Sequence, residues 1–138
     1  MRKIYELKNN FYTMNVKLDT KEQFKVLTLQ TDAITATMTE ELEQLLQLHS
    51  KTDIPHIVVN LQEVLEIDPE VAETFALVQQ NFYENSLSLV LCELKPEVLE
   101  VFKEEDLFDA LNYTPTLSEA WDIIQMEAIE RELMNGFE

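Results

Sequence analysis

Two histidines and an aspartate are the residues whose types and spacing come closest to a metal site. His49 and His56 lie seven residues apart, with Asp53 between them. Imidazole and carboxylate groups bind zinc, but a zinc site uses three or four protein ligands. One loop carboxylate beside two histidines is weak evidence. His56 is better explained as the start of a strand, where its ring hydrogen-bonds at the sheet edge. The sequence therefore predicts no metal site.

The only cysteine, Cys92, is the second candidate for chemistry. A nucleophilic cysteine needs a thiolate beside a base such as histidine. Cys92 instead ends an apolar run, which is typical of a small buried hydrophobic residue. A single cysteine also excludes an internal disulfide and a cysteine-rich zinc site, as expected in a reducing cytoplasm.

The remaining polar groups form no catalytic arrangement. None of the serines has the sequence context of a nucleophile elbow. The acidic run 104–106 lacks the glycine and the alternating oxygen ligands of a calcium loop. With Gly136 as the only glycine, a Gly-rich phosphate-binding loop is excluded. The sequence predicts a protein that is not an enzyme and has no cofactor.

The acidic residues are concentrated in the second part of the chain. Residues 1–51 carry seven basic and seven acidic residues, whereas residues 52–138 carry three basic and twenty acidic ones, which accounts for the whole net charge of −17. Such a surface repels phosphate backbones and anionic lipid head groups, so nucleic-acid binding is not expected. The charge either keeps the protein soluble or binds a basic partner, and binding to a basic partner would weaken as salt rises.

The length and hydropathy describe one globular domain outside the membrane. A chain of 138 residues suits a single core. No segment approaches the roughly 20 apolar residues that cross a bilayer. No apolar signal core follows the basic residues near the N-terminus. We expect a cytoplasmic protein without direct membrane insertion.

Apolar periodicity predicts an α/β fold with a mixed sheet of four to five strands and helices mainly on one face. Alternation predicts an antiparallel pair of strands, and a β-branched run predicts a buried strand after them. The strands are expected at 11–17, 23–30, 57–61, 86–92 and 112–114, with a loop at 19–22.

Capping signals predict where the helices begin. Thr37 with Glu40, and Thr116 with Glu119, have the spacing of capping boxes. A shorter helix is expected from Pro96, and the last helix is expected to run toward Met134, with Gly136 as its stop. Four aromatic residues at helical spacing are expected in the core rather than in a ligand site. These are Phe75, Phe82, Phe102 and Trp121.

The triplet Asp68–Pro69–Glu70 predicts the start of another helix, whose apolar stripe begins at Val71. Aspartate is a good N-cap because its carboxylate accepts hydrogen bonds from the first free amides. Proline at the first helical position loses no needed donor. Glutamate in the first turn interacts favourably with the helix dipole, by about 0.3–1 kcal/mol.

The stretch IVVNLQEVLEIDPEVAETFALV, residues 57–78, resembles the centre of a STAS domain, the fold of bacterial anti-sigma-factor antagonists. In that family an apolar strand ends in Asp-Leu-Ser, and an apolar-Asp-Ser-Ser-Gly-Leu motif later opens a helix. Here Asn60–Leu61–Gln62 takes the place of the first motif, and Ile67–Asp68 matches the start of the second. The stretches 86–111 and 114–124 resemble the strand, short helix and final capped helix that follow.

The resemblance covers about residues 12–126. It implies a single STAS-like domain over 1–138, with an N-terminal extension at 1–11 and a C-terminal helix extension at 127–138.

The sequence departs from the family where antagonists are switched by phosphorylation. Pro69 and Glu70 stand at the positions of the phosphorylatable residue, and Val71 replaces the glycine. Neither proline nor glutamate has a hydroxyl that accepts phosphate, so the resemblance implies a module that cannot be switched there. Glu70 either completes the helix start or supplies a fixed negative charge in place of phosphoserine. The family signature after the second strand is also altered, at 30–33.

By resemblance, the chain is a non-catalytic protein-interaction module of bacterial signalling and transcription regulation. Its partner would be an anti-sigma factor or a related switch kinase. Two alternatives stay open: a structural subunit of a lipid-transport ABC complex, and a small-molecule or lipid carrier with its ligand between helices and sheet. The sequence leaves oligomerisation open. The implied partner-binding residues are Thr31, Asp32, Asp68, Pro69, Glu70 and Glu73.

Overall fold

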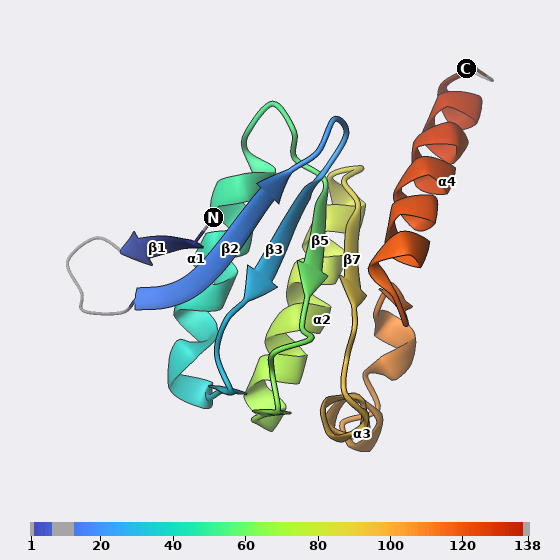
Figure 1. Cartoon of the computed structure of the whole chain (residues 1–138). Coiled ribbons are helices and arrows are strands. Elements are labelled where there is room, and N and C mark those ends of the chain that lie inside the picture. The colour runs from blue at the N-terminus through green and yellow to red at the C-terminus, as the bar shows by residue number, and fades with distance from the viewer. Residues whose placement is uncertain (1, 7–12, 137–138) are drawn as a thin grey trace.

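The structure is a computed structural model that describes residues 2–6 and 13–136. The described part of the chain forms one main sheet in the order β1-β2-β3-β5-β7-β8 (Figure 1). The first two pairings are antiparallel and the other three are parallel. The strands are β1 (Arg2–Glu6), β2 (Thr13–Thr20), β3 (Lys25–Leu29), β5 (Ile57–Asn60), β7 (Leu89–Cys92) and β8 (Tyr113–Thr114).

The helices form two unequal layers on the sheet (Figure 1). Three helices pack on one face around the large core, and the last helix packs on the other face, against β5, β7 and β8. The helical segments are η1 (Ala36–Met38), α1 (Thr39–Ser50), α2 (Pro69–Glu84), α3 (Pro96–Glu104), η2 (Phe108–Ala110) and α4 (Leu117–Gly136). The predicted mixed α/β class, with helices mainly on one face, is confirmed.

The N-terminal segment contributes more to the sheet than the sequence predicted. β1 adds a strand antiparallel to β2, within a stretch that was expected to be an extension. β2 continues to Thr20 and β3 begins at Lys25, so the turn between them lies at 21–24, two residues later than the predicted loop. Residues 11 and 12 of the predicted first strand lie outside the described residues.

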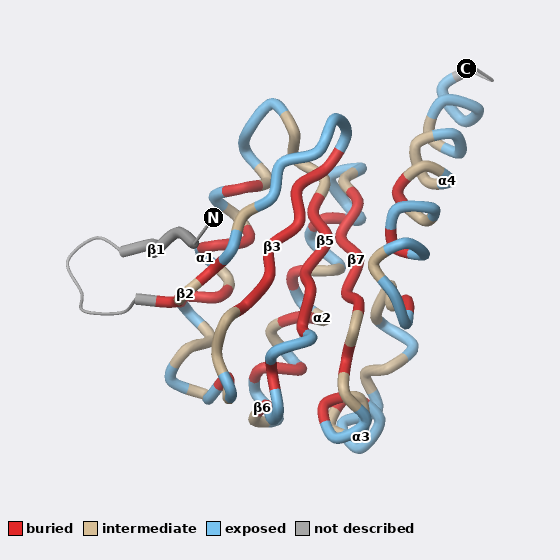
Figure 2. Tube along the Cα trace, in the orientation of Figure 1, coloured by how far each residue is buried: buried red, intermediate tan, exposed pale blue. Residues whose placement is uncertain are grey.

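The three middle strands are buried on both faces (Figure 2). Every residue of β3, β5 and β7 is buried, as expected for parallel strands covered by helices on both sides. Phe75, Phe82 and Phe102 are fully buried in the large core, as predicted. Trp121 was predicted to be in the core too, but it is 46% exposed and lies at the edge of the contact between α4 and the sheet, near Phe24 and Val26.

Of the two predicted capping boxes, that of Thr116 and Glu119 forms its N-cap bond, and that of Thr37 and Glu40 does not form. The Glu119 amide donates to Thr116 Oγ1 at 3.2 Å at the start of α4. The Thr37 prediction is wrong, since α1 begins at Thr39 after the short η1 segment. The Thr37 hydroxyl instead lies 2.9 Å from that of Thr35.

A buried lysine ties β3 to the end of α1. Lys25 Nζ donates to the His49 carbonyl at 3.0 Å and to Thr52 Oγ1 at 2.6 Å. The ammonium therefore lies at the negative end of the α1 dipole, which favours a cation. Burial lowers the pKa of Lys25. The hydrogen bonds offset part of the cost of burying this side chain.

Glu41 is a buried carboxylate on α1 that is only partly satisfied. Its side chain is 3% exposed, and Oε2 has no hydrogen-bond partner among the described residues. Burial raises the pKa of Glu41, and a hydrogen bond from the Met14 backbone lowers it by less. The folded protein thus holds this proton more tightly than the unfolded chain. The stability that the protonated form contributes is lost as the pH rises through the raised pKa.

We expect Glu41→Gln to raise the free energy of unfolding at pH 7 by about 1 kcal/mol, because it removes a buried charge that is only partly compensated. At pH 4 the two proteins should be equally stable, since Glu41 is then protonated when folded. Urea unfolding followed by circular dichroism at both pH values measures the difference. Glu40→Gln, at the exposed neighbouring position, is the control. A gain of the same size at both pH values would contradict the prediction.

Candidate partner-binding surface

The parallel strands bring two loops that are distant in sequence to one edge of the sheet. β3 and β5 run side by side, so their carboxyl ends meet at the same edge. The chain then enters β4 (Ala33–Ile34) after β3 and β6 (Glu66–Ile67) after β5. These two short strands pair in parallel as a small second sheet, and Figure 2 shows β6 beside the start of α2.

Backbone hydrogen bonds lock the two loops together. The Asp32 carbonyl accepts from the amides of Leu65 at 2.7 Å and Glu66 at 3.2 Å. The Asp68 amide donates to the Ile34 carbonyl at 3.1 Å. The structure therefore brings the predicted residue Asp32 beside the predicted helix start at Asp68.

Two further polar side chains shape these loops locally. Thr31 Oγ1 donates to the Ala33 carbonyl at 3.0 Å, which holds the turn that leads into β4. Asn60 Oδ1 accepts from the Gln62 amide at 2.9 Å. Asn60 thus forms a turn of the kind that asparagine and aspartate favour, directly after β5.

Asp68 occupies the N-cap position of α2, but its carboxylate does something different from the prediction. The residue is extended, with φ −78° and ψ 156°, and Pro69 follows at the first helical position. The carboxylate makes no bond to α2, and Oδ2 accepts from the Ala36 amide at 2.8 Å. Asp68 therefore holds the start of η1 against the start of α2.

The predicted residues differ in their accessibility. Asp32, Pro69, Glu70 and Glu73 are exposed, whereas Thr31 and Asp68 are partly buried. A protein that docks here would contact the first group directly, and the second group would hold the loops in place.

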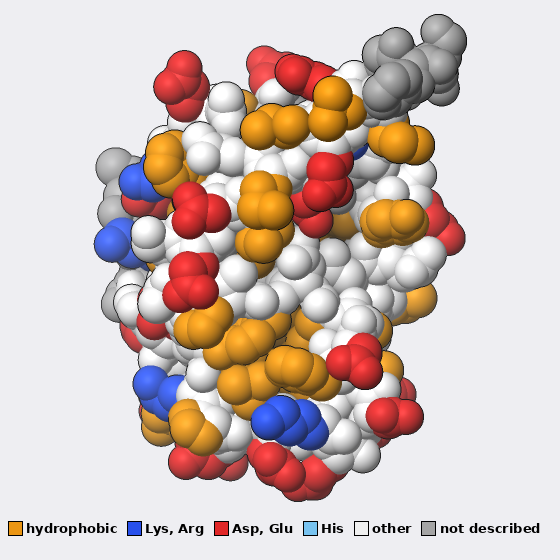
Figure 3. Space-filling view, turned by 90° about the vertical axis from the view of Figure 1, so that its right-hand side faces the viewer, with side chains coloured by type: hydrophobic (Ala, Val, Ile, Leu, Met, Phe, Trp, Pro, Cys, Tyr) orange, Lys and Arg blue, Asp and Glu red, His pale blue; other side chains and the backbone are white. Residues whose placement is uncertain are grey.

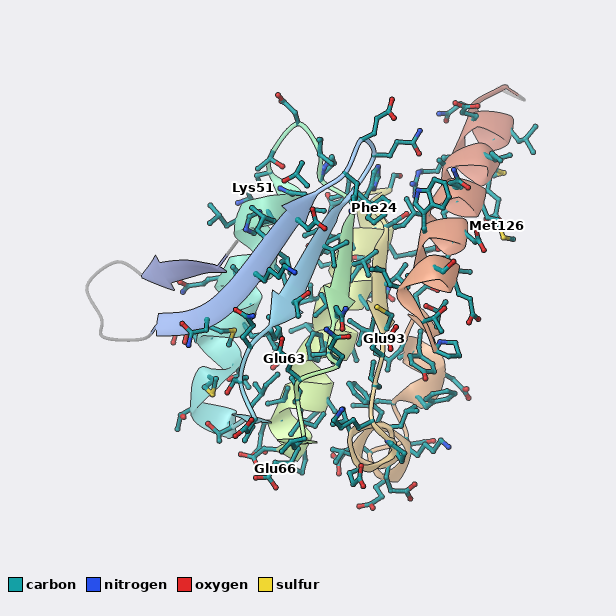
Figure 4. The ribbon with its side chains drawn as sticks, in the orientation of Figure 1. Phe24, Lys51, Glu63, Glu66, Glu93 and Met126 are labelled. Atoms are coloured by element: carbon teal, nitrogen blue, oxygen red, sulfur yellow. The ribbon has the colours of Figure 1, made fainter. Side chains whose placement is uncertain are left out.

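The structure adds three residues that the sequence did not single out. Glu63, Leu65 and Glu66 lie in the loop and short strand after β5, and all three are exposed. Leu65 is a large apolar side chain with half of its surface in solvent. Figure 4 shows Glu63 and Glu66 at the lower edge of the sheet, near α2. A two-residue strand is too short to leave a periodic pattern, so this surface was not visible in the sequence.

The structure shows the surroundings of the residues that were first considered as metal ligands or as a nucleophile. Among residues 14–135, no three His, Cys, Asp or Glu side chains lie close enough to hold a metal ion. Burial, with a smaller effect of Glu93, raises the pKa of Cys92 to about 12, so its thiol is not a nucleophile at neutral pH. No helix in the described part of the chain is long and apolar enough to span a membrane.

His56 hydrogen-bonds as expected, although its strand is central rather than at the edge. Its Nδ1 accepts from the Ser88 amide at 3.1 Å, which joins the starts of β5 and β7. Burial lowers the pKa of His56, and the positive charge of Arg131 lowers it further. A neutral imidazole that accepts a backbone hydrogen bond has a structural role.

Comparison with known families decides what this fold is. The STAS domain family matches residues 15–120. The chain belongs to the STAS domain family. The match ends at Ala120, shortly after α4 begins, and no curated protein matches the sequence.

Solved structures agree with this assignment at low sequence identity. A serine-to-glutamate variant of RsbS from Moorella thermoacetica is 16% identical with a TM-score of 0.66, over 82% of this chain and 97% of that one. The anti-sigma factor antagonist SpoIIAA in its unphosphorylated form is 15% identical with a TM-score of 0.62, over 80% and 96%. The murine anion transporter Slc26a9 is 11% identical with a TM-score of 0.66, over 89% of this STAS chain but only 22% of the transporter.

We expect Asp68→Ala to lower the free energy of unfolding by about 1 kcal/mol, because the Ala36 amide loses its acceptor. Asp68→Asn keeps an acceptor oxygen and should retain most of the stability. Urea unfolding measures both variants, and hydrogen exchange of the Ala36 amide should become faster only in Asp68→Ala. Equal losses in the two variants would show that charge, and not this hydrogen bond, is what matters.

Proposed function

We propose that this STAS domain is a non-catalytic protein-interaction module that works as an anti-sigma-factor antagonist does. Its partner would be an anti-sigma factor or a related switch kinase of bacterial transcription control. The docking surface would be the joined loops at the carboxyl ends of β3 and β5, together with the first turns of α2. The proposed contact residues are Thr31, Asp32, Asp68, Pro69, Glu70 and Glu73.

The observation that carries the proposal is the rigid connection between the two loops. Four hydrogen bonds through Asp32, Ile34, Asp68 and Ala36 hold them in one arrangement. A surface already held in its binding arrangement loses little conformational entropy when a partner docks. The exposed leucine, Leu65, supplies an apolar contact among acidic side chains, as is common in protein interfaces.

The start of α2 supports a module that phosphate does not switch. Pro69 and Glu70 are exposed, and neither has a hydroxyl group. The nearest hydroxyl along α2 belongs to Thr74, which donates to the Glu70 carbonyl at 2.9 Å within its own helix. Glu70 has one negative charge, less than that of phosphoserine, so it would imitate the phosphorylated state only in part.

The first test is to identify the partner and then to change Glu70. The tagged protein is used as bait in a lysate of its own organism, and the captured partner is purified and titrated by calorimetry. Glu70→Gln should weaken binding about fivefold, which corresponds to about 1 kcal/mol. Glu100→Gln, an equal change of charge on α3, should leave the affinity unchanged.

Each outcome of this test has a distinct meaning. An anti-sigma factor or switch kinase supports the proposal. Components of a transport complex would replace it with the structural-subunit alternative, which the fold of Slc26a9 makes reasonable. If Glu70→Gln folds normally and binds as tightly as the wild type, Glu70 is not a phosphoserine substitute.

A groove favours small-molecule carriage as a second candidate function. It lies between α4 and the β2–β3 turn, has a volume of about 520 Å³, and is of the size of many ligand pockets. Phe24 and Val26 come from the sheet side of the groove, and Leu117 and Trp121 come from α4. Figure 4 shows Phe24 at the end of the sheet that α4 passes.

Trp121 gives a direct measurement for this candidate, because it is the only tryptophan and it lines the groove. If the groove carries a ligand, native mass spectrometry should show a retained small molecule. The dye 1-anilinonaphthalene-8-sulfonate should then quench Trp121 fluorescence at micromolar concentration. Ser118→Phe fills the groove and should weaken dye binding at least tenfold. Unchanged dye binding in this variant would rule out the groove as the carrier site.

A further inference from the structure

Helix α4 carries apolar side chains on two opposite sides. Ala120 and Ile124 are buried against the sheet. Met126, Ile129 and Leu133 are 55%, 57% and 57% exposed. Their spacing of three and four residues places them in one row, on the side of the helix opposite the buried pair. We call these three residues the outer strip.

The exposed outer strip lies on the side of α4 that faces away from the sheet. Met126 points from α4 away from the sheet (Figure 4). The view of this side of the molecule shows separate hydrophobic groups with acidic side chains close to them (Figure 3). The end of α4 extends past β7 (Figure 1), and the three side chains of the outer strip are exposed.

The outer strip lies outside the part of the chain that the STAS family accounts for. The family match ends at Ala120, and the strip begins six residues later. The carboxyl ends of β3 and β5 are at the opposite end of the sheet from the far half of α4 (Figure 1). The strip is therefore a feature of this chain, separate from the proposed antagonist surface.

The side chains around the outer strip are acidic. Asp122 and Glu130 lie beside it on the helix surface, and both are exposed. The only basic residue of α4, Arg131, donates through its guanidinium to Ser88 Oγ at 3.0 Å on the sheet side. Any surface that packs on the strip must therefore tolerate negative charge.

A second feature next to the strip points to positively charged groups. A groove of about 500 Å³ runs between the end of α2 and α4. Glu84, Glu127 and Glu130 line it, together with Tyr83, whose ring is exposed, and Arg131. The three carboxylates outnumber this one guanidinium, which already donates to Ser88. Carboxylates beside an exposed aromatic ring attract lysine and arginine, through ion pairing and through cation–π contact. Glu130 belongs to both the groove and the edge of the outer strip.

We propose that the outer strip is a docking site for a basic amphipathic helix of a partner protein. The apolar side of that helix packs on Met126, Ile129 and Leu133, and its basic side chains reach Glu130 and the neighbouring groove. The strip extends about 10 Å along α4, which matches about two turns of the partner helix. Three partly exposed side chains form a small contact, so the affinity is micromolar.

The negative charge around the strip is unfavourable for two other occupants, a second copy of this chain and an anionic lipid surface. A second copy would bring two acidic borders together, and each chain carries a net charge of −17. Like charges facing each other across an interface are unfavourable. Anionic lipid head groups would be repelled for the same reason.

The proposal is tested with the full chain and three labelled 14-residue peptides, by fluorescence anisotropy at 100 mM salt. The first peptide places Leu at helical spacing and Lys elsewhere, the second has Glu in place of Lys, and the third is a scrambled form of the first. The first should bind with a micromolar Kd, and the other two at least tenfold more weakly. Equal binding of the scrambled peptide would overturn the proposal, because general attraction to an acidic protein would then explain the result.

Variants of the apolar side chains test whether the peptide binds to α4. The triple variant Met126→Ser, Ile129→Ser, Leu133→Ser should lose at least tenfold in affinity without loss of thermal stability. Leu48→Ser with Leu77→Ser removes equally exposed apolar groups from α1 and α2, and should leave binding unchanged. Unchanged binding in the triple variant would overturn the proposal.

Charge variants test the acidic border. Asp122→Asn with Glu130→Gln should weaken binding and reduce its dependence on salt. Glu97→Gln with Glu100→Gln removes the same charge from α3 and should have no effect. Equal losses in both pairs would overturn the proposal.

Sedimentation analysis tests whether a second copy of this chain binds the strip instead. If the wild-type chain dimerises at micromolar concentration and the triple variant does not, the strip binds a second copy and the proposal is wrong. Glu70→Gln should not change peptide binding, so this proposal and the antagonist function can fail separately.

Discussion

The burial of β3, β5 and β7 on both faces is the constraint on which the rest of this structure depends. Strands that are covered on both faces need helices on each side, and parallel neighbours need a crossover between them. The chain meets both demands by placing α1 and α2 between consecutive parallel strands, on one face, and α4 on the other. All three carboxyl ends then lie at one edge, where the loops after β3 and β5 meet. The position of the candidate surface follows from the way the core is covered.

Several polar side chains in this protein hold neighbouring helices and strands in place. Lys25 joins β3 to the end of α1, Asp68 joins two helix starts, and His56 joins the starts of two strands. Glu93 does the same for α4, since its carboxylate accepts from the Leu117 amide at 3.1 Å. The chain has only one glycine, and side-chain acceptors such as Asp68 and Glu93 hold loops and helix starts in place. Apart from the buried Glu41, most acidic side chains of the described residues are exposed, and they set the charge of the surfaces that partners meet.

Sequence reasoning worked best where periodicity alone sets the environment. The strands of the core, the apolar stripe of α2 and the positions of Phe75 and Phe102 were predicted because burial on one face repeats along the element. The sequence predictions were wrong where the group that a residue contacts comes from a distant part of the chain. Thr37 had the right spacing for a cap, yet it lies inside η1, whose first amide, that of Ala36, donates to the Asp68 carboxylate. Trp121 has helical spacing with buried residues, but it lines an open groove at the edge of the contact between α4 and the sheet.

The sequence by itself determined the fold class, the family resemblance, the acidic surface and the lack of a hydroxyl at Pro69 and Glu70. These are properties of local pattern and of side-chain chemistry, which do not depend on what lies nearby. Only the tertiary structure decided that Asp32 and Asp68 lie together, that Asp68 holds two helices rather than one, and that α4 presents a second apolar side to solvent. Each of these results depends on how segments far apart in the chain pack together, and a local sequence pattern does not show that packing.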